Sequence, residues 1–156
     1  AAFIEGWQGT HHFGLDLEQR PVFKKGDYRR ASLLQICAGP WVLIFDLKAI
    51  RNRTLKPLPD ALWNFLENEN HIFYGQGLSK DLARLAFEFD CVANGIDFGQ
   101  GKAWQDQCGG TLVACANRVL GTSVTQSKKL TMTNWDRRPL SKKEVQYAAE
   151  DAYLSW

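Results

Sequence analysis

Two apolar segments separated by only Gly39 and Pro40 constrain the fold of this chain more than any other feature of its sequence. Residues 32–38 and 41–47 are short runs rich in apolar residues and bounded by turn residues, which is typical of β-strands. A two-residue connection leaves room only for a tight hairpin. The two strands are therefore expected to be antiparallel neighbours in one sheet.

The rest of the chain completes a predicted α/β fold. A further strand is expected over residues 12–18, joined to the hairpin by a basic loop over residues 20–30. Later, strands are predicted at 71–74 and 96–98, and helices are predicted from Pro59, from Ser79 as the N-cap, and over 112–120 before Gly121. The glycine-rich residues 99–110 are expected to be irregular and mobile. This order predicts a mixed sheet of three antiparallel strands plus two further strands, flanked by helices.

Composition fits one globular domain over residues 1–156, because 45% of the residues are hydrophobic and 23% are charged. The chain begins without Met and ends inside a predicted helix, so we expect a domain trimmed from a longer chain. No apolar run reaches transmembrane length and no signal peptide is recognised, so no membrane partner is expected. The net charge of +2 does not by itself indicate a polyanion partner, although basic residues gather in 20–30 and in 128–143.

The four cysteines lack both Cys-x-x-Cys spacing and the density of a disulfide scaffold. Reduced thiols and an intracellular location are therefore expected, and a nuclear location is compatible with them. Cys108 and Cys115 could join His11 and His12 as zinc ligands, but structural zinc sites usually show tighter paired spacings.

A capped helix is predicted at the C-terminus. Ser141 and Glu144 have the Ser-x-x-Glu spacing of a capping box, which fixes the helix start and the phase of the residues that follow. Tyr147 and Asp151 are then neighbours one turn apart. The alternative is a tyrosine packed on the core beside a surface aspartate.

Asp16 and Glu18 lie two residues apart on a predicted strand, so both side chains leave the same face. Two carboxylates this close repel each other unless a cation lies between them. Hard divalent ions prefer oxygen ligands, so the pair favours Mg²⁺ or Mn²⁺ over zinc. The alternative is an acidic pair in salt bridges with Arg29 or Arg30, which an isolated Asp-x-Glu would favour.

A third acidic residue, Asp81, is expected in the first turn of a helix that follows the strand ending at Gly75. The helix dipole stabilises a negative side chain there, so ordinary capping is an alternative explanation. The order Asp16, Glu18, Asp81, Tyr147 and Asp151 is a stronger indication than any one of these residues.

Together, three motifs resemble those of the DEDD superfamily of 3′-5′ exonucleases, which share a ribonuclease H-like fold. The resemblance is closest to the branch that contains ribonuclease D and the Werner-syndrome exonuclease. Because Tyr147 stands four residues before Asp151 and position 146 is Gln146, the chain resembles the tyrosine subtype. The motifs are Gly14-Leu15-Asp16-Leu17-Glu18, Gly75-Gln76-Gly77-Leu78-Ser79-Lys80-Asp81-Leu82 and Tyr147-Ala148-Ala149-Glu150-Asp151-Ala152.

The resemblance implies a two-metal hydrolysis of DNA or RNA that starts at single-stranded 3′ ends and releases 5′-monophosphates. Asp16, Glu18 and Asp151 would hold one Mg²⁺ or Mn²⁺, and Asp16 would bridge to a second ion. Asp81 would act on that second ion through waters, and Tyr147 would orient the attacking water.

The resemblance also implies nucleic-acid contacts by Leu17, Gly77 and Trp135. Relatives commonly carry an aromatic residue directly after the Asp-x-Glu pair, whereas this chain has Gln19. The loss of this stacking is expected to weaken binding of the terminal base unless Trp135 or Phe23 replaces it.

An alternative function remains open. A catalytically silent relative would serve as an RNA-binding or protein-binding scaffold. Such relatives usually lose metal-binding carboxylates, and none of the four is missing here.

Overall fold

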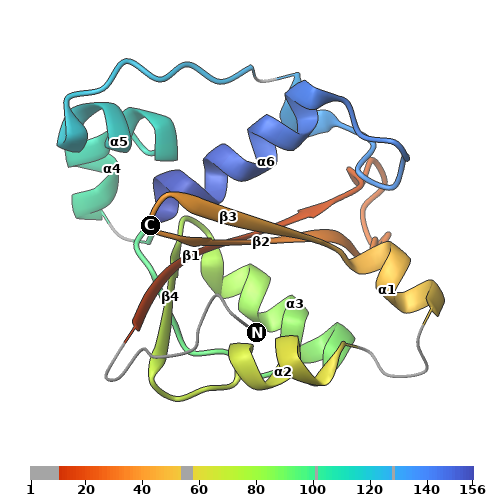
Figure 1. Ribbon diagram of the computed structural model, residues 1–156. Coiled ribbons are helices and arrows are strands. Elements are labelled where there is room, and N and C mark those ends of the chain that lie inside the picture. The colour runs from red at the N-terminus through yellow and green to blue at the C-terminus, as the bar shows by residue number, and fades with distance from the viewer. Residues whose placement is uncertain (1–10, 54–57, 101, 128) are drawn as a thin grey trace.

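The chain folds into a five-stranded mixed sheet with helices on both faces (Figure 1). The computed structural model describes residues 11–53, 58–100, 102–127 and 129–156. The strands are β1 (His11–Gln19), β2 (Ala31–Ala38), β3 (Trp41–Asp46), β4 (His71–Gly75) and β5 (Gly95–Asp97), in the sheet order β3-β2-β1-β4-β5. The first three are antiparallel neighbours, and β4 and β5 add to the sheet in parallel. The predicted fold class is confirmed.

Helix α6 covers one face of the sheet, and α2 and α3 lie on the other (Figure 1). The helices are α1 (Leu47–Arg53), α2 (Asp60–Leu66), α3 (Leu78–Phe89), α4 (Lys102–Cys108), α5 (Leu112–Leu120) and α6 (Lys142–Ser155), with a short 3₁₀ turn at Leu130–Met132. Helix α1 begins at Leu47, which the sequence had placed at the end of a strand. Among the described residues, no helix combines the length and the apolar character needed to cross a bilayer.

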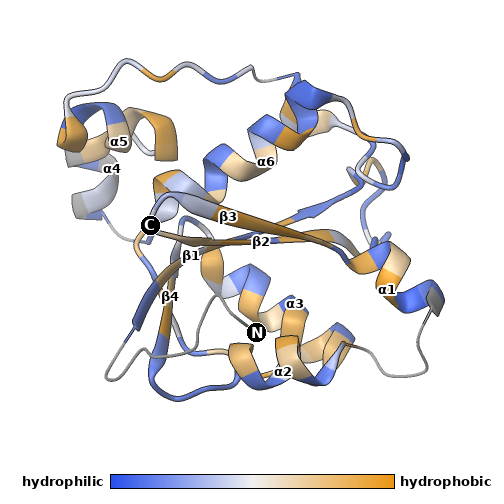
Figure 2. Cartoon of the chain, in the orientation of Figure 1, coloured by the Kyte–Doolittle hydropathy of each residue, from blue (hydrophilic) through white to orange (hydrophobic). Residues whose placement is uncertain are grey.

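The period-two alternation of β1 divides its side chains between the two faces. Phe13, Leu15 and Leu17 are buried in the main core with residues of α2 and α3. Asp16 and Glu18 therefore project from the opposite face, which α6 covers. Figure 2 shows hydrophobic residues along the central strands of the sheet. The sequence pattern thus positions the acidic pair beneath the C-terminal helix.

Helix α6 passes unusually close to β1 because Gly14 has no side chain. A Cβ atom added to Gly14 would lie 2.0 Å from the carbonyl oxygen of Ala152 and 2.8 Å from the backbone nitrogen of Trp156. No side chain fits in that space without moving the helix. The glycine therefore sets the distance between Asp16 on the strand and Asp151 on the helix.

The start of α6 is fixed by the predicted capping box. The Ser141 hydroxyl accepts a hydrogen bond from the Glu144 backbone nitrogen, and the Glu144 carboxylate accepts one from the Ser141 nitrogen at 2.7 Å. Arg137 also binds Glu144, at 2.7 Å, and Arg138 forms an ion pair with Asp46 at the end of β3. Two of the basic residues in the segment 128–143, Arg137 and Arg138, therefore help to hold this helix in place.

The predicted N-cap of α3 is wrong. Helix α3 begins at Leu78, and its N-cap is Gly77, which has a φ of +76° and offers no side chain. The cap is provided from a distance, because the Asp97 carboxylate at the end of β5 accepts hydrogen bonds from the backbone nitrogens of Gly77 (2.9 Å) and Ser79 (3.0 Å). The Asp97 carboxylate from β5 thus provides the capping hydrogen bonds that the sequence assigned to Ser79.

The prediction that residues 99–110 are irregular is also wrong, because α4 lies within this segment. The Trp104 ring lies 4.8 Å from the ring of Phe98, which anchors the helix beside β5. The glycines that weakened the helical pattern instead end the helix, since Gly109 and Gly110 both have positive φ.

Candidate active site

Three carboxylates meet where β1 runs beneath α6. Asp16, Glu18 and Asp151 each offer one oxygen, and these oxygens all lie within 4.8 Å of one another. Within the described parts of the chain, no other group of three or more His, Cys, Asp or Glu side chains is arranged this way, so the zinc hypothesis has no support. Nor do Asp16 and Glu18 form the alternative salt bridge with Arg29, which pairs with Asp27 at 3.2 Å.

Burial raises the pKa of every carboxyl in this cluster, and neighbouring carboxylates raise the pKa of Asp16 and Glu18 further. Burial followed by the charges of Glu18, Asp81 and Asp151 raises the pKa of Asp16 well above its usual value. The pKa of Glu18 rises to about 9 through burial and through the charges of Asp151 and Asp81. Burial also raises the pKa of Asp151. A bound cation would relieve this repulsion, and an all-oxygen donor set fits Mg²⁺ or Mn²⁺.

Asp81 lies outside the three-carboxylate cluster but within its electrostatic field. It stands in the first turn of α3, and burial raises its pKa to about 7, with Arg84 lowering it and Asp97 raising it. Its charge in turn raises the pKa of Asp16 and Glu18. Asp81 is therefore close enough to add its negative charge to the attraction of cations to this site.

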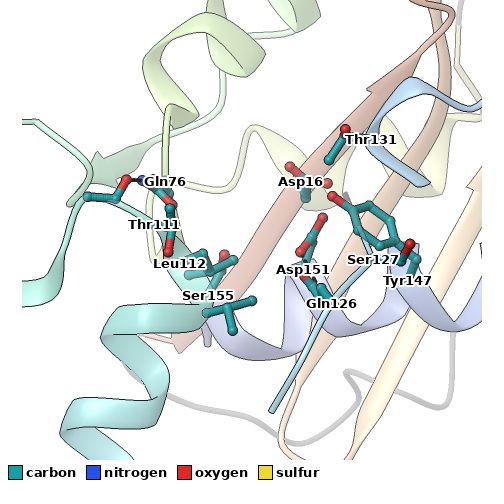
Figure 3. A pocket seen from close by; sticks show the side chains of 12 residues that line it. Asp16, Gln76, Thr111, Leu112, Gln126, Ser127, Thr131, Tyr147, Asp151 and Ser155 are labelled. Carbon is teal, nitrogen blue, oxygen red and sulfur yellow. Dashed lines mark hydrogen bonds between the residues drawn. The ribbon is translucent and has the colours of Figure 1, made fainter. Parts of the chain in front are cut away.

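Tyr147 extends from α6 toward the carboxylates (Figure 3). Its hydroxyl donates a hydrogen bond to Asp151, and its ring centroid lies 6.0 Å from that of Trp135. Burial, followed by the charge of Asp151, raises the pKa of the phenol. The hydroxyl therefore keeps its proton at neutral pH, while the ring packs on the core.

A pocket of about 610 Å³ opens beside this cluster. Asp16, Tyr147 and Asp151 lie on one side of it, and Gln76, Thr111 and Leu112 lie on the other (Figure 3). The pocket is large enough for a small organic ligand and has carboxylates at one end.

Gln126 is a residue of the site that no sequence motif indicated. Its Nε2 donates to Asp151 Oδ1 at 2.8 Å. Gln126 lies in an irregular segment between α5 and the 3₁₀ turn, where neither period nor motif marks it. Gln76 belongs to a recognised motif, but its hydrogen bond to the Gly110 carbonyl at 2.7 Å joins two loops that are distant in sequence.

Burial counts against side-chain contacts with nucleic acid at two of the predicted residues. Trp135 is fully buried beneath Tyr147, so its ring is closed to a base. The side chain of Leu17 is buried in the main core. Gly77 remains partly exposed at the start of α3, and its contact stays a prediction. Phe23 is 79% exposed in the loop after β1 and is the aromatic residue still available for stacking.

A family model that describes 3′-5′ exonucleases matches residues 1–155. The chain belongs to the 3′-5′ exonuclease family. Membership of the DEDD superfamily, near the ribonuclease D and Werner-syndrome exonuclease branch, is thereby confirmed.

Relatives of this exonuclease family member come from plants and animals. A 3′-5′ exonuclease of Arabidopsis thaliana is 26% identical over 153 residues, which cover 95% of this chain and 51% of the plant protein. The bifunctional 3′-5′ exonuclease/ATP-dependent helicase WRN of Mus musculus is 26% identical over 144 residues, covering 90% of this chain and 10% of the mouse protein. The chain therefore spans about half of the first relative and a tenth of the second.

The fold of this exonuclease family member is shared with the crystal structure of Escherichia coli RNase D, an exoribonuclease involved in structured RNA processing. The two superpose with a TM-score of 0.70 at 21% identity, over 93% of this chain and 36% of the RNase D chain. The expected ribonuclease H-like fold is confirmed.

Proposed function

We propose that this chain is a metal-dependent 3′-5′ exonuclease domain that hydrolyses the phosphodiester bonds of DNA or RNA and releases 5′-monophosphates. One observation carries the proposal. In a member of this family, Asp16, Glu18 and Asp151 meet within 4.8 Å at the edge of a pocket that Tyr147 also lines. We propose that residues 1–156 form a single domain with this activity.

Each carboxylate has a defined role in this proposal. Asp16, Glu18 and Asp151 would hold one of two Mg²⁺ or Mn²⁺ ions, and Asp16 and Asp81 would serve the second, Asp81 through water. The ions would supply Lewis-acid activation of a water molecule and charge stabilisation at the scissile phosphate. Gln126 orients Asp151, because its amide donates to the Oδ1 atom of that carboxylate.

Tyr147 positions the attacking water instead of deprotonating it. Its raised pKa makes the phenolate scarce at neutral pH, so the hydroxyl is a poor base and a good hydrogen-bond donor. Its hydrogen bond to Asp151 fixes the direction of the hydroxyl relative to the carboxylates.

The pocket can take a terminal nucleotide. Its volume of about 610 Å³ lies in the range of pockets that bind small ligands, and a single nucleotide is a ligand of that kind. Gln76 and Thr111 add polar side chains to the wall away from the carboxylates. We therefore propose single-stranded 3′ ends of DNA or RNA as the substrate.

The test is a time course with oligonucleotides labelled at the 5′ end, in DNA and RNA, with Mg²⁺, Mn²⁺ or EDTA. Stepwise shortening with either ion and none with EDTA is expected. Asp16→Asn should abolish cleavage without changing the circular dichroism spectrum, whereas Asp27→Asn, at an exposed acidic residue paired with Arg29, should cleave like the wild type. Cleavage that survives EDTA would overturn the proposal, and binding without any cleavage would establish the silent scaffold instead.

A further inference from the structure

Gln35 is a buried amide without a partner in the middle of the sheet. Gln35 is 0% exposed, and neither the Oε1 nor the Nε2 atom of its side chain has a hydrogen-bond partner among the described residues. Buried side-chain amides are normally satisfied, because an unpaired one loses its hydrogen bonds to water and gains none in return. An unsatisfied amide in a central strand therefore requires an explanation.

The strand register places Gln35 directly opposite Asp16. The two residues are Cα partners in the antiparallel pairing of β1 with β2, so their side chains leave the same face of the sheet. Directly opposite residues have Cβ atoms about 4.5–5.5 Å apart. A glutamine amide can span that distance to a neighbouring carboxylate by rotating its side chain.

The cross-strand partner of Gln35 on its second flank is apolar. On its second flank, β3 places Ile44 opposite it. Leu33, two residues earlier on the same face of β2, packs with Trp135, Tyr147 and Ala148 beneath α6. Across the strands, Asp16 is thus the polar neighbour of this amide, and Ile44 offers it no hydrogen bond.

We propose that Gln35 is a positioning residue for the metal centre, and that its amide donates to the Asp16 carboxylate when a divalent cation is bound. This inference rests on the proposed function, because it assigns a role toward the same ions. A carboxylate oxygen that binds a metal keeps lone pairs for a further donor, and such donors fix the orientation of the ligand. The Gln35 amide has no partner among the described residues, and an Asp16 carboxylate held in place by a cation would accept its hydrogen bond.

The test compares Gln35→Met with the wild type by titrating Mn²⁺ in a calorimeter and by urea unfolding in EDTA. Methionine keeps the length of the side chain and removes the amide. Loss of such an outer donor typically weakens metal affinity by about 10- to 100-fold, and we expect a weakening of at least about tenfold. Without metal the urea midpoint should stay equal or rise, because an unpaired buried amide is removed.

Cys37→Ala is the matched control. Cys37 is buried on the same face of the same strand, one register step further along, opposite Gly14. This substitution should lower the urea midpoint and leave Mn²⁺ affinity within about twofold of the wild-type value, since no metal ligand faces it. A disturbed strand β2 would instead weaken Mn²⁺ binding in both variants.

A second test uses the Asp16→Asn background, where Gln35→Met should weaken Mn²⁺ binding no further. Unchanged Mn²⁺ affinity in Gln35→Met, equal weakening in Cys37→Ala or a lower urea midpoint in Gln35→Met would each overturn the role of Gln35. Failure of the wild-type protein to bind Mn²⁺ would refute the metal-dependent function itself, which distinguishes the two proposals.

Discussion

Replacing Glu18 with glutamine should stabilise the metal-free protein even though it removes a ligand of the proposed metal centre. Burial and the charges of Asp151 and Asp81 raise the pKa of Glu18 from 4.5 to about 9 in the folded state. Between these two values the folded chain binds a proton that the unfolded chain releases. The free energy of unfolding therefore falls as the pH rises through this range, and glutamine, which mimics the neutral acid, avoids the loss.

The size of the effect follows from that range. At pH 7 the solution lies about 2.5 pH units above the unfolded pKa, which corresponds to at most about 3 kcal/mol of lost stability at about 1.36 kcal/mol per unit. At pH 5 the same reasoning gives at most about 1 kcal/mol. Glu18→Gln should therefore raise the free energy of unfolding more at pH 7 than at pH 5.

The assay is urea unfolding at pH 5, 7 and 8 in EDTA, repeated with saturating Mn²⁺. Glu69→Gln, at an exposed position after α2, is the control and should change stability by less than about 0.5 kcal/mol. With Mn²⁺ the order should reverse, because only the wild type gains the full free energy of ion binding. A Glu18→Gln protein that is destabilised in EDTA, or equally stabilised at pH 5 and pH 8, would refute the reasoning.

Three further substitutions test the geometry. Gly14→Ala puts a Cβ atom 2.0 Å from the Ala152 carbonyl oxygen. The free energy of unfolding measured in urea should therefore fall by about 1–3 kcal/mol, and calorimetry should show weaker Mn²⁺ binding. Unchanged values would contradict the close approach of α6. Tyr147→Phe keeps the ring against Trp135 and removes the hydroxyl. The kcat should therefore fall about 10- to 100-fold while Mn²⁺ affinity is preserved. An unchanged kcat would exclude a positioning role. Asp97→Asn removes the charge with which β5 caps the start of α3. The free energy of unfolding should therefore fall by about 1 kcal/mol. An unchanged urea midpoint would show that this cap contributes nothing to stability.

The parts of the fold that the sequence predicted correctly depend on neighbours along the chain. The alternation in β1 decides which residues share a face, and the capping box from Ser141 to Glu144 fixes the start of α6. Both patterns are complete within a few residues, so no tertiary information is needed to read them. Together they predicted that Asp16 and Glu18 share one face of β1 and that Tyr147 and Asp151 share one face of α6.

The wrong predictions concern residues whose role is decided by a distant partner. Ser79 is a good N-cap by type, yet Asp97 from another strand satisfies the start of α3. Trp135 had the chemistry of a base-stacking residue, but the packing of α6 on β2 buries it. Gln126 lies in a segment without a local pattern, and only its hydrogen bond to Asp151 in the folded chain makes it part of the site.

The close approach of α6 to β1 links the assembly of the site to the packing of the helix. Asp16 and Glu18 lie two residues apart on one face of β1, so they repel each other whenever that strand forms. Asp151 joins them only when α6 lies against Gly14. The three-carboxylate cluster therefore exists only in the docked state of the helix. Because a cation that needs all three ligands binds that state alone, metal binding must stabilise the docking of α6 by the same free energy with which docking strengthens metal binding.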